Sequence, residues 1–138
     1  MRIRPIALAL TVVTTVALAG CLNQQDRAEA LTAAERIHSF VRTQDFASIY
    51  RESSDAFKQN GDESRFVASM KAIYESIGTL KGAKAVAYQS TIDSNAGRLH
   101  VLMFDLEFER GRGKERVVFT RDKNGELRLW DIGIQPAN

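Results

Sequence analysis

In the first half of the chain, apolar residues recur with the period of an α-helix. Between residues 28 and 41 they return at helical spacing, which predicts an amphipathic helix of about 16 residues. Thr32 and Glu35 fit either a capping box or ordinary exposed positions on this helix. The apolar stripe that predicts its buried face consists of Ala28, Leu31, Ala34, Ile37, Phe40 and Val41.

Capping residues predict two further helices. Asp45 can cap a short helix that the polar stretch Ser53–Asp55 interrupts, and Asp62 can cap a longer one. Gly78 is expected to end the longer helix, because glycine accepts the left-handed backbone of a C-terminal stop. The stripe that predicts another core face consists of Phe66, Met70, Ile73 and Ile77.

From Ala83 onward, apolar and polar residues alternate with a period of two, as in the strands of an antiparallel sheet. Turn signals at Asn95–Gly97, Gly111–Arg112 and Asn124–Gly125 divide this half into four strands. One face of the sheet is apolar and is expected to pack against the helices. Its predicted members are Val86, Tyr88, Ile92, Leu102, Phe104, Leu106, Phe108, Val117, Phe119, Trp130, Ile132 and Ile134.

The same turns predict how the strands pair. Each register places apolar residues opposite apolar residues and acidic residues opposite basic ones. The predicted pairs are Tyr88 with Phe104, Val86 with Leu106, Phe104 with Phe119, Leu106 with Val117, Glu107 with Arg116, Glu109 with Lys114, Phe119 with Trp130 and Val117 with Ile132. The fold class is therefore α+β, with N-terminal helices packed on a curved four-stranded antiparallel sheet, in a single domain over residues 28–138.

The N-terminus has the pattern of an export signal. A short cationic start with Arg2 and Arg4 is followed by the uncharged run Ile6–Leu18, which is shorter than the roughly 20 residues that a membrane-spanning helix needs. The end of this segment, Leu18-Ala19-Gly20-Cys21, resembles the lipobox of bacterial lipoproteins. By that resemblance residues 1–20 are a lipoprotein signal peptide and Cys21 is lipidated. An ordinary secretory signal with an incidental cysteine, or an uncleaved anchor, is the alternative.

The residues after Cys21 predict where the protein resides. Inner-membrane lipoproteins of Gram-negative bacteria typically carry Asp after the lipidated Cys, so by the same resemblance Leu22 indicates the outer membrane, on its periplasmic side. Residues 21–27 are expected to form a short, polar, lipidated tether that reaches at most about 20 Å. The folded part is thus expected close to the membrane surface.

Composition excludes several classes of function. Of the 138 residues, 19 are basic and 17 are acidic, and the removal of Arg2 and Arg4 leaves a formally neutral domain. Neutrality argues against a nucleic-acid partner, which would require a surplus of basic side chains on one surface. One Cys and two His argue against a disulfide framework and a Cys/His zinc site. No metal and no cofactor are expected.

The order of motifs along the chain resembles a known superfamily. The segments concerned are Thr43–Phe46, Ser54–Lys58, Gly78–Leu80, the four strands, and Asn124–Ile132. They are similar to small exported bacterial domains of unknown function in the cystatin-like and nuclear transport factor 2-like superfamily. The resemblance implies a cone-shaped cavity between helices and a bent sheet, which relatives use as an enzyme pocket, a ligand site or a protein-binding surface.

No catalytic constellation can be assembled from the sequence. The carboxylates of ketosteroid isomerase-like relatives have no counterpart here that can be matched residue by residue, and Asp93 is most simply a turn residue. Side chains that could line a cone are nevertheless present, and the alternative for each is a structural role in the core or on the surface. These candidates are His38, Tyr50, Tyr74, Tyr88, His100 and Trp130.

The outer face of the sheet is a second candidate surface. Apolar residues on it are expected to mark a partner site or a homodimer, unless they are ordinary surface residues or are covered by residues 22–30. They are Val101, Met103, Val118, Thr120 and Leu129.

We therefore expect a membrane-tethered periplasmic lipoprotein that acts as a binding or assembly module for a protein or envelope component, without catalysis. The alternative is a small-molecule binding or enzymatic cone of the ketosteroid isomerase-like type. Inhibition of a periplasmic hydrolase is a third hypothesis, for which the chain offers no recognisable inhibitory loop.

Overall fold

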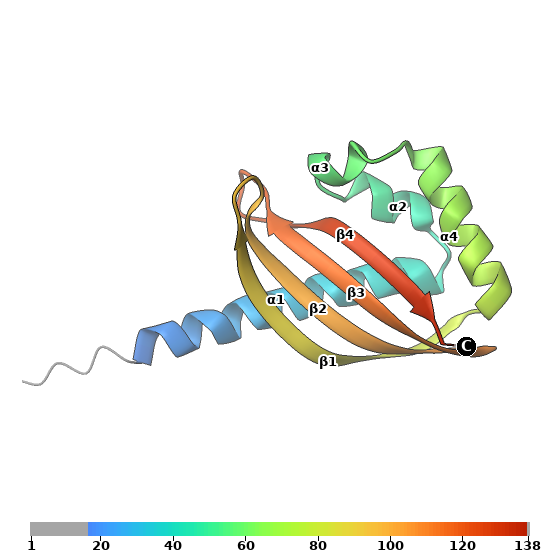
Figure 1. The fold of residues 1–138 in the computed structure, drawn as a ribbon, viewed down its shortest axis with the longest axis horizontal. Helices are drawn as coiled ribbons and strands as arrows, with labels where there is room; N and C mark the ends of the chain where they lie inside the picture. Colours follow the sequence, from blue (N-terminus) through green and yellow to red (C-terminus); the bar gives the residue numbers. More distant parts are fainter. Residues whose placement is uncertain (1–16, 138) are drawn as a thin grey trace, which may run out of the picture.

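The computed structural model describes residues 17–137, with side chains from Leu22 onward, and consists of helices followed by one curved sheet (Figure 1). The elements are α1 (Ala17–Arg42), α2 (Phe46–Arg51), α3 (Asp55–Lys58), α4 (Glu63–Ile77), β1 (Leu80–Asp93), β2 (Gly97–Phe108), β3 (Gly111–Arg121) and β4 (Leu127–Pro136). The strands form a four-stranded antiparallel sheet in the order β1-β2-β3-β4, with helices against its inner face. The predicted α+β class and architecture are confirmed.

The helix boundaries follow the predicted caps. The Asp45 carboxylate accepts the Ser48 N–H at the start of α2, and the Asp62 carboxylate accepts the Arg65 N–H at the start of α4. Ser54 caps α3 where the sequence predicts an interruption. Gly78 ends α4 with φ of 83°, a left-handed backbone that favours glycine.

Helix α1 begins earlier than predicted. It spans 26 residues from Ala17 and includes Leu22–Arg27, so these residues are helical and do not form an extended tether. The Arg121 guanidinium holds this part of the helix through Asp26 and Glu29, at 2.9 and 2.7 Å. Residues 1–16 of the predicted signal peptide lie outside the described residues.

The β2–β3 register differs from the prediction. The turn is Glu109–Arg110, and Phe104 pairs with Glu115 instead of Phe119. The turn is held at this place because its backbone N–H groups donate to the carbonyls of Thr79 and Ile77. The predicted pairs of Leu106 with Val117, Glu107 with Arg116 and Glu109 with Lys114 are consequently wrong. The displacement is even, so each side chain of β3 still lies on its predicted face.

The β3–β4 register is correct at Val117 and Ile132 but changes before the turn. Phe119 pairs with Leu129, and an irregularity leaves Trp130 without a direct partner. The Asp122 carboxylate accepts the N–H groups of Asn124 and Glu126, which makes the connection wider than a two-residue Asn-Gly turn. Leu129 therefore belongs to the core, while Trp130 is only partly buried.

The β1–β2 hairpin is also shifted. Tyr88 pairs with Leu102 instead of Phe104, and Asp93 is a turn residue, as predicted, that accepts the N–H groups of Asn95 and Ala96. Val86 lies in an irregularity and is 50% exposed, and Ile92 near the turn is 68% exposed. Their assignment to the core face is wrong, because a bulge rotates Val86 and the helices do not cover the end that carries Ile92.

The core lies between the helices and the inner face of β2, β3 and β4. Tyr74 of α4 packs between Phe46 of α2 and Phe108 of β2, with ring centroids 5.3 and 5.8 Å away. The predicted stripe of α1 is buried at Ala34, Ile37 and Val41, whereas Ala28 is exposed. This packing brings the His38 side chain of α1 to Glu115 of β3.

Candidate functional site

A histidine and a carboxylate meet inside the core. His38 of α1 and Glu115 of β3 are each 1% exposed, and His38 Nε2 lies 2.6 Å from Glu115 Oε2. The edge of the His38 ring faces Phe104, with centroids 4.8 Å apart. Nε2 donates to the carboxylate, since an ionised carboxyl group can only accept.

Two buried polar atoms, one within this pair and one on the nearby Tyr74, have no hydrogen-bond partner in the described part of the chain. Among the described residues, Glu115 Oε1 and Tyr74 Oη are buried without a hydrogen bond. Burial, together with the negative charge of Glu115, raises the pKa of Tyr74, so the phenol is neutral. Unpaired buried polar atoms are rare, and they identify this cluster as the most unusual polar site of the core.

The cluster is closed to solvent. Tyr74, like His38 and Glu115, belongs to the buried residues, so a substrate would need a rearrangement of the core to reach it. His38 and Tyr74 were predicted to line the cavity, whereas Glu115 was not predicted. The strand alternation does point to Glu115, because it shares parity with Val117 and Phe119 and so lies on the core face. Its charge, however, suggested an exposed position.

A second histidine is buried in the β1–β2 hairpin. His100 is fully buried, and its Nδ1 lies 3.0 Å from the hydroxyl of the stacked Tyr88 ring. His100 Nε2 has no partner among the described residues. Burial lowers the pKa of His100, which keeps the ring neutral near pH 7.

Tyr50 and Trp130, the remaining predicted lining residues, lie elsewhere. The Tyr50 hydroxyl donates to the Gly61 carbonyl at 2.8 Å, and its ring joins an aromatic cluster with Phe57 and Phe66. Trp130 borders a hollow beside the connection of α2 and α3. The six predicted residues therefore do not line a single cone: His38 and Tyr74 are in the core, Tyr88 and His100 are in a hairpin, and Tyr50 and Trp130 are at separate places.

The predicted partner face is smaller than expected. Leu129 is buried in the core and Val118 is fully buried, so neither can contact a partner. Thr120 is also buried, and its hydroxyl donates to the Ala96 carbonyl. The irregular pairing of β4 turned Leu129 inward. Val101 and Met103 are partly exposed and are what remains of this surface for the predicted homodimer.

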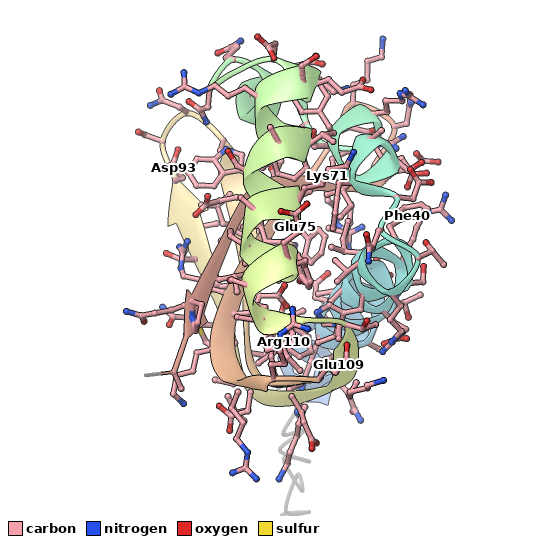
Figure 2. All side chains as sticks on the ribbon, turned by 90° about the vertical axis from the view of Figure 1, so that its right-hand side faces the viewer. Phe40, Lys71, Glu75, Asp93, Glu109 and Arg110 are labelled. Carbon is pink, nitrogen blue, oxygen red and sulfur yellow. The ribbon has the colours of Figure 1, made fainter. Side chains whose placement is uncertain are left out.

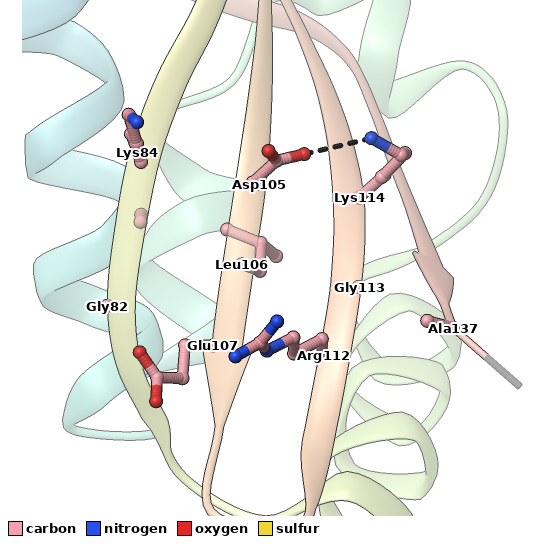
Figure 3. A pocket seen from close by; sticks show the side chains of 10 residues that line it. Gly82, Lys84, Asp105, Leu106, Glu107, Arg112, Gly113, Lys114 and Ala137 are labelled. Carbon is pink, nitrogen blue, oxygen red and sulfur yellow. Dashed lines mark hydrogen bonds and ion pairs between the residues drawn. The ribbon is translucent and has the colours of Figure 1, made fainter.

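A groove of about 580 Å³ lies on the outer side of the sheet, near the turn between β2 and β3 (Figure 3). Charged side chains of β1, β2 and β3 surround it, and the C-terminal segment closes one side, where the Ala137 N–H donates to the Arg112 carbonyl at 2.8 Å. Lys114 Nζ and Asp105 Oδ1 form an ion pair of 2.9 Å across the strands. The residues that line the groove are Gly82, Ala83, Lys84, Asp105, Leu106, Glu107, Arg112, Gly113, Lys114 and Ala137.

The described part of the chain offers no group of three or more His, Cys, Asp or Glu side chains placed to hold a metal ion. Within residues 17–137, no helix combines the length and the apolar character needed to cross a membrane.

Comparisons with known proteins add a family and a fold. A family model described as "Protein of unknown function (DUF4019)" matches residues 33–131. No curated protein is significantly similar in sequence.

Two solved structures are similar in fold at 11% sequence identity. One, from Catenulispora acidiphila, has a TM-score of 0.59, with 84% of this chain and 94% of that chain covered. The other, Bdellovibrio bacteriovorus Bd1075, has a TM-score of 0.53, with 81% of this chain and 41% of that chain covered.

Proposed function

This chain belongs to the DUF4019 family of proteins of unknown function, and we propose that it is a lipid-anchored binding module of the bacterial envelope without catalysis of its own. One observation carries the proposal: the polar cluster of the core is sealed, while the charged groove on the outer sheet face is open to a partner. Binding at the groove needs no rearrangement of the core.

The anchor in this proposal is a lipid on Cys21. The support is the resemblance of Leu18–Cys21 to a lipobox after an uncharged apolar run. Leu22 in place of Asp supports the outer membrane, with the domain on the periplasmic side.

We also assign the fold to the cystatin-like and nuclear transport factor 2-like superfamily. The support is the observed order of helices followed by a bent four-stranded sheet that packs against them, together with the motifs named above. Here the His38–Glu115 pair and its apolar neighbours occupy the space between helices and sheet.

The groove favours a protein segment that carries charges of both signs. Lys84, Asp105 and Lys114 lie in one row across three strands, and Glu107 stands opposite Arg112 in the next row (Figure 3). These side chains are exposed, so an incoming charge replaces water at little cost in desolvation. The alternating signs exclude a strongly anionic partner such as a nucleic acid.

Charge reversal in the groove tests the proposal. We expect Arg112→Glu and Asp105→Lys to reduce capture of a partner from detergent-solubilised envelope at least tenfold, whereas Lys71→Glu on the exposed face of α4 leaves capture unchanged (Figure 2). A photo-crosslinker placed at Lys84 is expected to label the same partner. Equal capture by all three variants would remove the groove from consideration.

A ligand-binding or enzymatic cone is the second candidate, and the unpaired Glu115 Oε1 and Tyr74 Oη favour it. A small hydrophobic carbonyl compound that enters the core would satisfy the Tyr74 hydroxyl and shift the NMR signals of the His38 ring. Such a shift, with partner capture unaffected by Arg112→Glu, would favour the cone over the module.

A further inference from the structure

The start of α1 and the turn end of the β1–β2 hairpin border a hollow of about 650 Å³. Leu22, Asn23 and Asp26 contribute from the helix, and Tyr88, Ser90 and Arg98 contribute from the inner face of the hairpin. This end is distant from α4 and from the groove, since the first turns of α1 extend past the sheet on the side opposite α4 (Figure 1).

Exposed apolar side chains border this hollow. Among the side chains that the structure describes, the large apolar ones that are exposed are Leu22, Val86 and Ile92. Leu22 lines the hollow and is 63% exposed. Ile92 stands directly opposite Arg98 in the hairpin and follows Ser90 on the same face, so it lies at the rim. The two apolar groups are thus next to one polar hollow.

Arg98 supplies a positive charge at the same place. Its guanidinium donates to the neutral Ser90 hydroxyl at 3.1 Å, and no carboxylate among the described residues forms an ion pair with it. Asp26, which also lines the hollow, is occupied by Arg121 at 2.9 Å. Asp93 beside Ile92 directs its carboxylate to the amides of its own turn. Arg98 is therefore the charged lining residue that lacks an ion-pair partner among the described residues.

Tyr88 adds a hydrogen-bond donor. When His100 carries its proton on Nδ1, it donates to the Tyr88 oxygen, and its buried Nε2 is then an unmet acceptor, which is tolerated better than an unmet donor. In this tautomer the Tyr88 O–H does not serve His100, and the Ser90 hydroxyl is its other polar neighbour. Arg98 and Tyr88 together present donors for an anionic oxygen such as a phosphate oxygen.

We propose that this end of the molecule lies on a phospholipid bilayer, with a lipid headgroup phosphate in the hollow at Arg98 and Tyr88 and with Leu22 and Ile92 in contact with the acyl region. The inference rests on the proposed lipid anchor, because Cys21 immediately precedes Leu22 in α1 and places the lipid at the same end. An aromatic ring, an arginine and flanking apolar side chains are the residue types that suit a membrane interface. The bilayer then leaves the groove on the outer sheet face accessible to a partner.

Quenching by brominated lipids tests this orientation. The full lipidated chain carries Trp130→Phe, and a single tryptophan is introduced by Ile92→Trp or, as a matched exposed control on α4, by Lys71→Trp. Both are reconstituted in vesicles of phosphatidylethanolamine and phosphatidylglycerol with bromine on the acyl chains. We expect fluorescence of the Ile92→Trp variant to be quenched at least twofold more than that of the Lys71→Trp variant. Equal quenching overturns the inference.

A second set of variants tests the contact between Arg98 and the headgroup. Arg98→Gln added to the Ile92→Trp variant is expected to reduce quenching to the control level, and Arg112→Gln in the groove is expected to leave it unchanged. If both substitutions have the same effect, the hollow does not hold a headgroup. Flotation of the vesicles separates the two proposals: a chain that does not float lacks the lipid anchor, whereas a chain that floats without selective quenching refutes the orientation alone.

Discussion

At the scale of single residues, Glu115 is the most informative position. Burial alternates from Gly113 to Val117 in its strand, and its side chain occupies an inner position where Val or Phe would satisfy the pattern. A buried carboxylate is tolerated here because His38 lies 2.6 Å away. Such pairs seldom stabilise a fold relative to apolar residues of similar volume, so we expect this pair to add little net stability.

A mutant cycle on this pair tests that view. We expect His38→Leu to lower the free energy of unfolding by about 3–5 kcal/mol, because Glu115 then remains buried without a partner. The double variant His38→Leu/Glu115→Leu is expected to recover most of this loss. Denaturant unfolding at neutral pH measures both. Additive losses in the double variant would contradict the coupling.

His100 predicts a pH dependence of stability. Burial lowers the pKa of His100 in the folded state below the value of about 6.5 in the unfolded chain, so the unfolded state binds more protons in this window. Stability is therefore fully present above about pH 6.5 and falls as the pH decreases toward the lowered pKa. We expect His100→Phe to reduce the loss of stability between about pH 7.5 and about pH 5.5, as measured by urea unfolding. An unchanged loss would mean that His100 does not titrate in this range.

At the scale of elements, the junction of α4 and β1 determines the register of the sheet. The Arg110 side chain donates to the last carbonyls of α4, at Glu75 and Ser76, and its backbone N–H donates to Ile77 (Figure 2). The β2–β3 turn is thus bound to the end of a helix. A free hairpin would choose its turn from local residues alone, which is why Gly111–Arg112 predicts a different register.

Gly78 tests the importance of this junction. A Cβ at Gly78 would lie 2.8 Å from Glu109 Cβ at φ of 83°, whereas Gly125 has a similar φ of 81° with no atom within 4 Å. We expect Gly125→Ala to destabilise the protein by about 1 kcal/mol and Gly78→Ala by about 3 kcal/mol. Thermal or denaturant unfolding measures the difference. Equal losses would show that only the backbone conformation matters.

At the scale of the whole molecule, α1 connects the proposed membrane anchor to the sheet. Arg121 of β3 bonds both Asp26 and Glu29, and the hydrogen bond from Arg121 lowers the pKa of Glu29. These contacts hold α1 on the domain at Asp26 and Glu29. An anchor on this helix therefore orients the whole domain, where an extended tether would leave it free to rotate.

Hydrogen exchange tests this attachment. We expect Arg121→Gln to lower global stability by less than about 1 kcal/mol, because the ion pairs are partly exposed, but to speed amide exchange severalfold over residues 22–29. Arg116→Gln removes a comparable pair with Asp131 on the outer sheet face and serves as the control. Unchanged exchange in Arg121→Gln would show that α1 is held by its apolar face alone.

The site was predictable only in part. His38 was expected beside the cavity because it follows Ile37 in the helical stripe, and its burial agrees with that expectation. Its partner Glu115 was missed because charge argues for the surface unless a specific buried partner exists, and that partner is 77 positions away in the chain. Leu129 and Trp130 exchanged roles for a similar reason: the bulge in β4 has no local signature.

The sequence alone determined the long helices, the strands, the caps of α2 and α4 and the two-layer α+β class, because each depends on neighbours a few residues away, whereas the short helix α3 was missed. Asp45, Asp62 and Gly78 act through the adjacent backbone, and the periods of 3.6 and 2 are local as well. Only the tertiary structure decided the strand registers, the His38–Glu115 pair and the hollow beside Leu22. These depend on contacts between distant segments, where an interaction such as Arg110 with the end of α4 outweighs the preference of a short turn.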